Sequence, residues 1–151
     1  NCMLRLVIGP SPEKIELPKD YKFKVGVGAE LTKGNDAILF GYGPVMLHEA
    51  LVAANYLKKI GFNLKVVNMP WLNKIDEVWL KEIVKDQRRI FVLEDHSAIG
   101  GLGDRILNAL VETNLIEGDK DYSFIFVEID GNTVAYSCYG ESTGTIGGYD
   151  L

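Results

Sequence analysis

The sequence predicts a three-layer α/β/α fold, in which helices cover both faces of a mostly parallel sheet of about five strands. Short apolar runs alternate along the chain with stretches whose apolar residues recur at helical spacing. Near-continuous apolar runs are typical of parallel strands that are buried on both faces. One early segment instead alternates with a period of two, which predicts a single antiparallel strand at an edge of the sheet.

Length and composition favour one globular domain. The chain has 151 residues, of which 47% are hydrophobic and 25% charged, which is ordinary for a domain with a real core. Sixteen Lys and Arg residues against 21 Asp and Glu residues give a net charge of −5. This balance argues against a nucleic-acid or anionic-membrane partner, because such surfaces require a basic patch.

The two cysteines, Cys2 and Cys138, lack the C-x-x-C spacing of a metal site. We therefore expect no metal site and no disulfide framework, and a cytoplasmic location. The sequence also shows no signal peptide and no apolar run long enough to cross a bilayer.

The first 22 residues are expected to form a linker or arm. Residues 9–12 read Gly-Pro-Ser-Pro, and Pro18 follows, so regular structure is interrupted twice. The domain is expected to occupy residues 23–151. It begins with the alternating segment Phe23–Ala29, the predicted edge strand.

Three strand–helix units follow, and a last apolar run, residues 124–127, closes the series. The first unit has a strand at 37–40 and a helix that ends at Gly61, a common residue just after a helix. The second has a strand at 64–67 and a helix whose N-cap is Asn73 or Asp76. The third has a strand at 90–93 and a helix that opens after a glycine turn. The apolar residues expected to face the core are Leu47, Ala50, Leu51, Ala54, Leu57 and Ile60 in the first helix, Ile75, Val78, Trp79 and Ile83 in the second, and Ile106, Leu107, Leu110 and Val111 in the third.

The turn Gly41-Tyr42-Gly43-Pro44 invites comparison with a dinucleotide-binding loop. Met46 stands where the third glycine of that fingerprint would fall, and Pro44 removes an N–H that a phosphate would use. No acidic residue closes the following strand. A tight strand-to-helix turn is the better interpretation.

The densest cluster of polar residues and glycines is the segment at 94–103, E-D-H-S-A-I-G-G-L-G. It follows a strand and opens a helix, which is where open α/β sheets place ligands. In a functional interpretation, His96 donates a proton or a hydrogen bond and the glycine N–H groups face an anion. In a structural one, Glu94 and Asp95 cap the helix while Gly100, Gly101 and Gly103 permit close packing or positive φ. The residues alone leave both open, and they indicate no catalytic triad and no metal ligands.

Five stretches, in order, resemble the C-terminal part of transketolases and deoxyxylulose-phosphate synthases. Residues 94–103 are similar to the family's E-[ED]-H-x-x-x-G-G-L-G motif. The loop at 68–76 resembles N-x-P-x-[LI]-K-P-[LI]-D, with Asn73-Lys74 in place of Lys-Pro. The other three are residues 5–12, similar to the tail of a preceding pyrimidine-binding domain, 36–46, similar to the first strand and turn of the C-terminal domain, and 139–142, similar to F-G-E-S.

The resemblance implies a C-terminal domain of a thiamine-diphosphate-dependent transferase that moves two-carbon ketol units between sugar phosphates. It implies that thiamine diphosphate and Mg²⁺ are bound by other domains, because this chain has neither G-D-G nor the Asn-Asn pair of the cofactor site. The implied partners are other transketolase domains or a partner subunit, in a homodimer. Glu94, Asp95, His96 and the three glycines would then form a ligand or domain-interface loop.

Two other functions stay open at this stage. The chain could be a stand-alone interaction or small-anion-binding module that uses the turn at 100–103. A nucleotide-dependent oxidoreductase is less favoured, because the fingerprint is broken at Met46.

Overall fold

The computed structural model describes residues 14–87, 89–94, 99–113 and 115, together with the backbone of strands at 124–130, 133–139 and 148–150. These residues form a seven-stranded sheet with the order β1-β3-β2-β4-β5-β6-β7. Asp95 and His96 of the candidate loop, and residues 1–13 of the expected arm, lie outside the described residues.

Four parallel strands form the centre of the sheet. They are β3 (Leu64–Asn68), β2 (Ala37–Gly41), β4 (Ile90–Leu93) and β5 (Phe124–Asp130). In the register, Gly41 at the end of β2 faces both Asn68 of β3 and Leu93 of β4. The three strands therefore end at one level, and the loops that follow them share one edge.

Antiparallel strands complete both ends of the sheet. The short β1 (Ala29–Glu30) pairs with β3 at one edge. At the other end β6 (Thr133–Tyr139) pairs with β5, and β7 (Gly148–Asp150) pairs with β6. The predicted α/β class and the antiparallel edge strand are confirmed, and the sheet has two strands more than the five expected.

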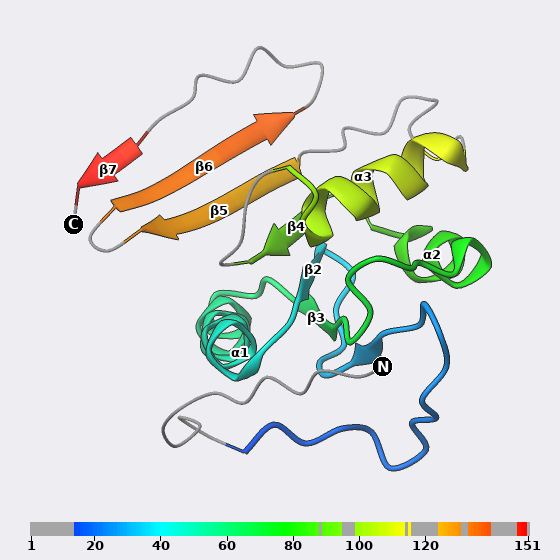
Figure 1. Ribbon diagram of the computed structural model, residues 1–151. Helices are drawn as coiled ribbons and strands as arrows, with labels where there is room; N and C mark the ends of the chain where they lie inside the picture. The colour runs from blue at the N-terminus through cyan, green and yellow to red at the C-terminus, as the bar shows by residue number, and fades with distance from the viewer. Residues whose placement is uncertain are drawn as a thin grey trace.

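Helices cover both faces of the sheet, as Figure 1 shows. Helix α1 (Pro44–Lys59) covers one face, and α2 (Glu77–Val84) and α3 (Leu102–Glu112) cover the other. Side chains at alternate positions along the strands point to opposite faces of the sheet and belong to two separate cores. The α1 core contains Ala37, Met46, Leu47, Ala50, Ala54, Leu64, Val66 and Leu93. The α2–α3 core includes Ile38, Phe40, Val67, Met69, Leu80, Ile83, Val84, Ile90, Val92, Leu102, Ile106 and Leu110.

The ends of α1 and the start of α2 follow the sequence signals. At the C-terminal end of α1, Gly61 has φ 83° and its N–H donates to the Lys58 carbonyl at 3.1 Å. The Phe62 N–H donates to the Leu57 carbonyl at 3.0 Å, which completes a Schellman motif. Helix α2 begins at the N-cap Asp76, whose carboxylate accepts the Trp79 N–H at 2.9 Å. Of the two caps predicted for α2, Asp76 is the one used.

The expected strand from Phe23 to Ala29 is wrong except for its last residue. Gly26 has φ 77°, and the Val27 N–H donates to the Lys24 carbonyl at 3.2 Å, so the chain turns here instead of extending. The Phe23 ring packs against Trp71, with ring centroids 5.0 Å apart. A local turn and an aromatic contact thus replace the ladder that alternation predicts.

For each helix, one residue that the sequence pattern placed in the core is exposed instead. Ile60 is 78% exposed, Val78 79% and Val111 55%. Ile60 lies just beyond α1, where the chain leaves the helical path. In α2 the buried residues are Leu80, Ile83 and Val84, so the buried stripe is rotated away from Val78. Helix periodicity therefore placed the helices correctly but set their faces only approximately.

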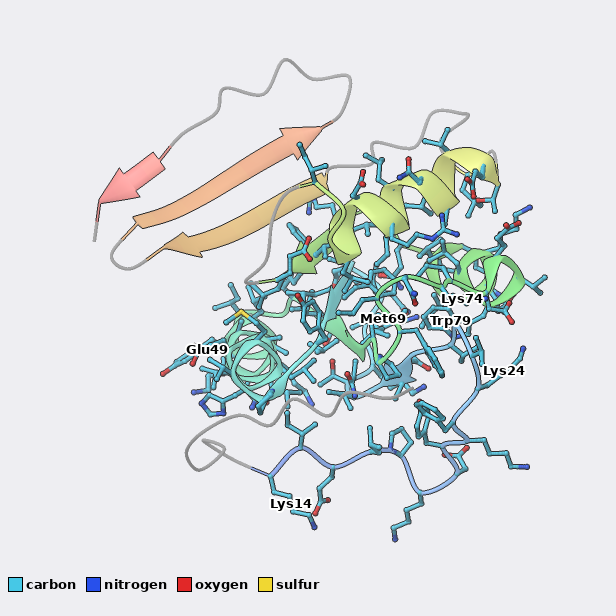
Figure 2. The ribbon with its side chains drawn as sticks, in the orientation of Figure 1. Lys14, Lys24, Glu49, Met69, Lys74 and Trp79 are labelled. Carbon is cyan, nitrogen blue, oxygen red and sulfur yellow. The ribbon has the colours of Figure 1, made fainter. Side chains whose placement is uncertain are left out.

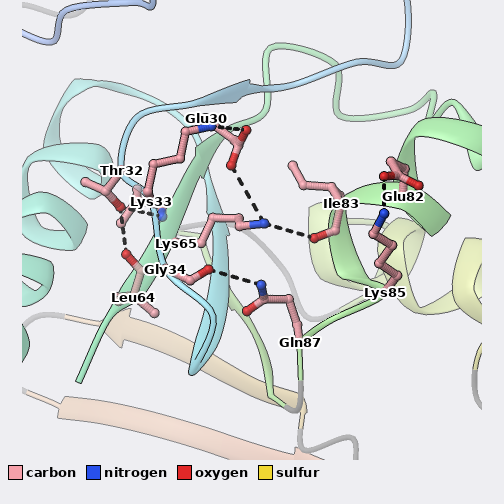
Figure 3. A network of polar contacts seen from close by, with 11 residues as sticks. Glu30, Thr32, Lys33, Gly34, Leu64, Lys65, Glu82, Ile83, Lys85 and Gln87 are labelled. Carbon is pink, nitrogen blue, oxygen red and sulfur yellow. Dashed lines mark hydrogen bonds and ion pairs between the residues drawn. The ribbon is translucent and has the colours of Figure 1, made fainter. Parts of the chain in front are cut away.

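A polar network fastens residues 30–34 to the sheet and to α2 (Figure 3). The Thr32 hydroxyl donates to the Leu64 carbonyl at 2.7 Å and accepts the Val66 N–H at 2.8 Å. The Lys65 ammonium lies 3.7 Å from the Glu30 carboxylate and donates to the Ile83 carbonyl at 3.3 Å. The segment that follows β1 is thus part of the domain. None of the helices among the described residues has the length and apolar character to cross a membrane.

Candidate functional site

The candidate site lies where the connections from two neighbouring strands diverge. From β2 the chain enters α1 and returns as β3, whereas from β4 it enters α3 and returns as β5 on the other side. Because α1 and α3 cover opposite faces, the carboxyl ends of β2 and β4 form a topological switch point. Open α/β sheets commonly bind ligands at such a point.

Glu94, one of the predicted site residues, is buried at the end of β4 and makes two hydrogen bonds. It follows β4 directly and is only 4% exposed. One carboxylate oxygen, Oε2, accepts the Leu102 N–H at 2.8 Å, and Oε1 accepts the Gly103 N–H at 3.0 Å. These are the first N–H groups of α3, which have no partner inside the helix. The carboxylate of Glu94 therefore caps α3 from eight residues upstream.

The glycines of the predicted loop lie at the start of α3. Gly101 is the N-cap residue and has extended backbone angles, while Gly100 has φ 78°, a conformation that favours glycine. The Gly100 N–H donates to the Asp104 carboxylate at 3.2 Å. Three N–H groups of the turn are thus bonded to carboxylates of this chain. Asp104 was not singled out in the sequence, although its place in the first turn of the helix was a usable signal.

The turn after β2 has the features of a strand-to-helix connection. Gly43 is the N-cap residue of α1 and has φ 76°, and Pro44 follows in the first turn. The Leu47 N–H donates to the Gly43 carbonyl at 3.1 Å. As a glycine, Gly43 has no side chain to cap α1, and the first turn of the helix has no acidic residue. The structure thus matches the tight turn that the sequence favoured over a dinucleotide-binding loop.

A second group of contacts joins the N-terminal segment to the loop after β3. The Lys24 ammonium lies 2.7 Å from the Asp76 carboxylate, and the Asp76 N–H donates to the Gly26 carbonyl at 2.9 Å. The Lys24 ammonium, followed by the Trp79 N–H, holds the pKa of the Asp76 carboxyl below its ordinary value. Sequence reasoning missed this pair, because 52 residues separate its members.

Two other polar or aromatic side chains, His48 and Trp79, make contacts within the chain. His48 lies on α1, 4.0 Å from the Glu49 carboxylate, and Figure 2 shows Glu49 pointing away from the sheet. Trp79 packs edge-on against Phe40, with ring centroids 6.3 Å apart. Within the part of the chain that the structure describes, no three His, Cys, Asp or Glu side chains are grouped so as to hold a metal ion.

A comparison with protein families gives a match over most of the domain. Residues 26–123, more than half of the chain, match the family described as "Transketolase, C-terminal domain". The match begins at Gly26 and includes α1, α2 and α3.

Curated relatives share about a third of the matched residues. An uncharacterized transketolase family protein of Sinorhizobium fredii is 32% identical over 111 residues, which are 73% of this chain and 32% of the relative. A 1-deoxy-D-xylulose-5-phosphate synthase of Desulfitobacterium hafniense is 30% identical over 68% of this chain and 16% of its own length. A transketolase C-terminal section of Methanocaldococcus jannaschii is 34% identical over 66% of this chain and 30% of its own length.

Solved structures give the same fold. One described as a split gene transketolase, inactive beta4 tetramer, superposes with a TM-score of 0.62 and 30% identity. The superposition covers 78% of this chain and 37% of that chain. This chain therefore spans about a third or less of the relatives that it matches.

Proposed function

Because the chain belongs to the transketolase C-terminal domain family, we propose that it is the C-terminal domain of a transketolase-like enzyme that depends on thiamine diphosphate. In the complete enzyme, two-carbon ketol units pass between sugar phosphates. This chain is non-catalytic by itself. It serves assembly and supports the active site from outside the cofactor-binding domains.

One observation above all supports this proposal: each similarity covers most of this chain but only a minor part of the related protein. The similarity covers 68% of this chain but only 16% of the synthase, and 78% of this chain but 37% of the split gene transketolase. The matched region is therefore a minor part of larger proteins. A minor part without G-D-G or an Asn-Asn pair would leave thiamine diphosphate and Mg²⁺ to the rest of the enzyme.

The domain boundary that we propose lies between residues 22 and 23. From Phe23 onward the chain makes specific contacts with the loop after β3, through Trp71 and Asp76. Residues 1–22 would be the arm that leads from a preceding pyrimidine-binding domain. The partners would be the other transketolase domains or a partner subunit, in a cytoplasmic homodimer.

The alternative, a small-anion-binding module, would use the N–H groups at residues 100–103. In the structure Glu94 already accepts the Leu102 and Gly103 N–H groups, and Asp104 accepts that of Gly100. An incoming phosphate would have to displace a buried carboxylate and would meet a second negative charge. The geometry therefore favours a supporting domain over an anion-binding one.

Two measurements test the proposal. Mixing this chain with the remaining domains should yield a complex with ketol-transfer activity that requires thiamine diphosphate, while this chain alone should show none. The proposal fails if the complete protein also lacks G-D-G and the Asn-Asn pair. Titrating the isolated chain with sugar phosphates tests the alternative, which would gain support from saturable binding that Gly101→Asp abolishes.

A further inference from the structure

Phe23 and Val25 are apolar side chains that the fold leaves in contact with water. They belong to the alternating segment that ends at Ala29, which is buried, whereas Phe23 is 68% exposed and Val25 54%. Val25 lies at the tip of the turn that is closed by the hydrogen bond from the Val27 N–H to the Lys24 carbonyl. Turns favour glycine, proline and short polar residues. The stability of the turn therefore does not explain an apolar side chain at its tip.

Phe23 is held against the loop that follows β3. Its ring packs on Trp71, with the ring centroids 5.0 Å apart and the ring planes tilted by 31°. The next residue, Leu72, is another exposed apolar side chain. Aromatic side chains are enriched in protein–protein interfaces, because a rigid ring buries a large apolar area at a small cost in conformational entropy. The Phe23 ring, ordered by Trp71 and still mostly exposed, has these properties.

The start of α2 adds a fourth exposed apolar side chain. The Asp76 N–H donates to the Gly26 carbonyl at 2.9 Å, and a Cβ on Gly26 would lie 2.6 Å from the Asp76 nitrogen, so the turn and the helix are in direct contact. Val78, two residues further on, is 79% exposed. Single apolar side chains scattered over a surface are ordinary, whereas a group of them marks an interaction site. We call this group the turn patch, and it consists of Phe23, Val25, Leu72 and Val78.

Charged side chains of both signs surround the turn patch. Lys22, Lys24 and Lys74 are exposed, and Figure 2 shows Lys24 and Lys74 on the same side of the molecule. Lys24 lies 2.7 Å from the Asp76 carboxylate, and Glu77, the first residue of α2, is an exposed carboxylate. A surface with both signs can match itself across a two-fold axis, because lysines of one copy can face carboxylates of the other. Two copies of a chain with a net charge of −5 therefore repel each other less at this surface than over the chain as a whole.

We propose that the turn patch is the surface through which two copies of this chain associate around a two-fold axis. The inference deepens the proposed function, on which it rests for the expectation of a homodimer. A second copy removes the four apolar side chains from water, and this burial supplies the free energy of association. Phe23 is the centre of the contact, because its ring is already ordered by Trp71 and loses little freedom on binding.

Sedimentation velocity on the isolated chain measures this association. We expect the wild type to pass from monomer to dimer as its concentration rises from about 1 μM to about 1 mM, the range for a small interface. Val78→Glu places a carboxylate in the turn patch, and should raise the dimer dissociation constant at least about tenfold. The helix itself should tolerate the change, because a negative charge is favourable in the first turn of α2.

Ile60→Glu is the matched control. Ile60 is 78% exposed, as Val78 is 79% exposed, but it lies just beyond the end of α1 and outside the turn patch. Both substitutions remove one exposed β-branched side chain and add one negative charge, so a general repulsion between copies is the same in both. We expect Ile60→Glu to leave the dissociation constant within about twofold of the wild type. A wild type that stays monomeric at about 1 mM, or equal dissociation constants for the two variants, overturns the proposal.

A second measurement uses the wild type alone and holds even if Val78→Glu does not fold. The NMR methyl signals of Val25, Leu72 and Val78 should shift as the concentration of the chain rises, because these side chains become covered in the dimer. The methyl signals of Ile60 should stay in place. Methyl signals of the turn patch that do not move while the chain dimerises would show that another surface forms the contact.

These measurements separate the turn patch from the proposed function, because they need neither the cofactor nor the other domains. If the chain restores thiamine-diphosphate-dependent turnover to the remaining domains but stays monomeric by itself, the turn-patch proposal alone is wrong. If the chain dimerises through the turn patch but restores no turnover, the proposed function alone is wrong.

Discussion

At the scale of single residues, Asp76 holds together parts of the chain that are distant in sequence. Its carboxylate accepts the Trp79 N–H at 2.9 Å and pairs with Lys24 at 2.7 Å, while its own N–H donates to the Gly26 carbonyl. It therefore starts α2 and anchors the N-terminal segment at once. The cap was predictable from local sequence, whereas the ion pair required the fold.

Two substitutions separate these roles of Asp76. Asp76→Ala removes both the cap and the ion pair and should lower the free energy of unfolding by about 1–2 kcal/mol. Asp76→Asn retains a good N-cap side chain and should cost less than about 1 kcal/mol, since Lys24 is mostly exposed. Urea denaturation at pH 7 measures both. Equal losses in the two variants would mean that the ion pair, not the cap, dominates.

The same pair predicts a dependence on pH. The pKa of the Asp76 carboxyl is lower in the folded chain than its ordinary value. Its contribution is therefore complete above the unfolded pKa of about 3.9 and is lost as pH falls through the lower folded pKa. The difference in unfolding free energy between the wild type and Asp76→Asn should shrink below about pH 4. A difference that stays constant down to pH 2 would contradict this assignment.

At the scale of elements, the segment before β1 packs against the domain at two glycines, Gly26 and Gly28, where there is no room for a side chain. A Cβ on Gly26 would lie 2.6 Å from the Asp76 backbone nitrogen, and one on Gly28 would lie 2.8 Å from the Asn68 carbonyl oxygen. These two neighbouring atoms are backbone and have little freedom to move; a Cβ on Gly28 would also lie 2.7 Å from the Met69 sulfur. This close approach explains why a segment with a single turn and two paired residues stays on the sheet.

Gly26 and Gly61 form a matched pair for testing this docking. Both have positive φ, 77° and 83°, but a Cβ on Gly61 has no atom within 4 Å. Gly61→Ala should cost only the conformational strain of about 1–2 kcal/mol. Gly26→Ala should cost clearly more in the same denaturation assay and should disturb the NMR signals of Trp71. If the two variants lose the same stability, the close contact does not hold the segment.

The central elements were predictable, because each has a complete local signal. The runs at 37–40, 64–67 and 90–93 became β2, β3 and β4, and Gly61 ends α1 as expected. The segment at 23–28 was not predictable, because alternation is equally compatible with a strand and with a turn whose partner, Trp71, is remote. Strand β6 was missed although Asp130-Gly131-Asn132 between two β-rich runs is a recognisable hairpin signal.

The location of the candidate site could be predicted from the sequence, but its hydrogen bonds could not. An acidic residue after a strand and a cluster of glycines before a helix marked the switch point between β2 and β4. The sequence could not decide what bonds the glycine N–H groups. That depends on the folded structure, in which the Glu94 carboxylate accepts the Leu102 and Gly103 N–H groups, eight and nine residues along the chain.

At the scale of the whole molecule, the sheet separates two cores. Leu47 of α1 belongs to one core, and Ile106 and Leu110 of α3 belong to the other. Because the strands lie between them, side chains on opposite faces share few neighbours. The stability of the domain should therefore divide into two nearly independent contributions.

Double substitutions test this separation. Leu47→Ala and Ile106→Val should be additive in unfolding free energy to within about 0.5 kcal/mol. Leu110→Ala and Ile106→Val are the control pair in one core, one helical turn apart, and should depart from additivity by at least about 0.5 kcal/mol. Strong coupling between Leu47 and Ile106 would show that the sheet transmits repacking from one face to the other.

The central claim is that this domain supports an active site whose cofactor residues lie elsewhere. The most direct test compares thiamine-diphosphate-dependent ketol transfer by the complete enzyme, by this chain alone, by the enzyme without this domain, and by the last two mixed. We predict turnover in the complete enzyme and in the mixture, and none above background in either part alone. Turnover by this chain alone, or full turnover by the enzyme without it, would contradict the account.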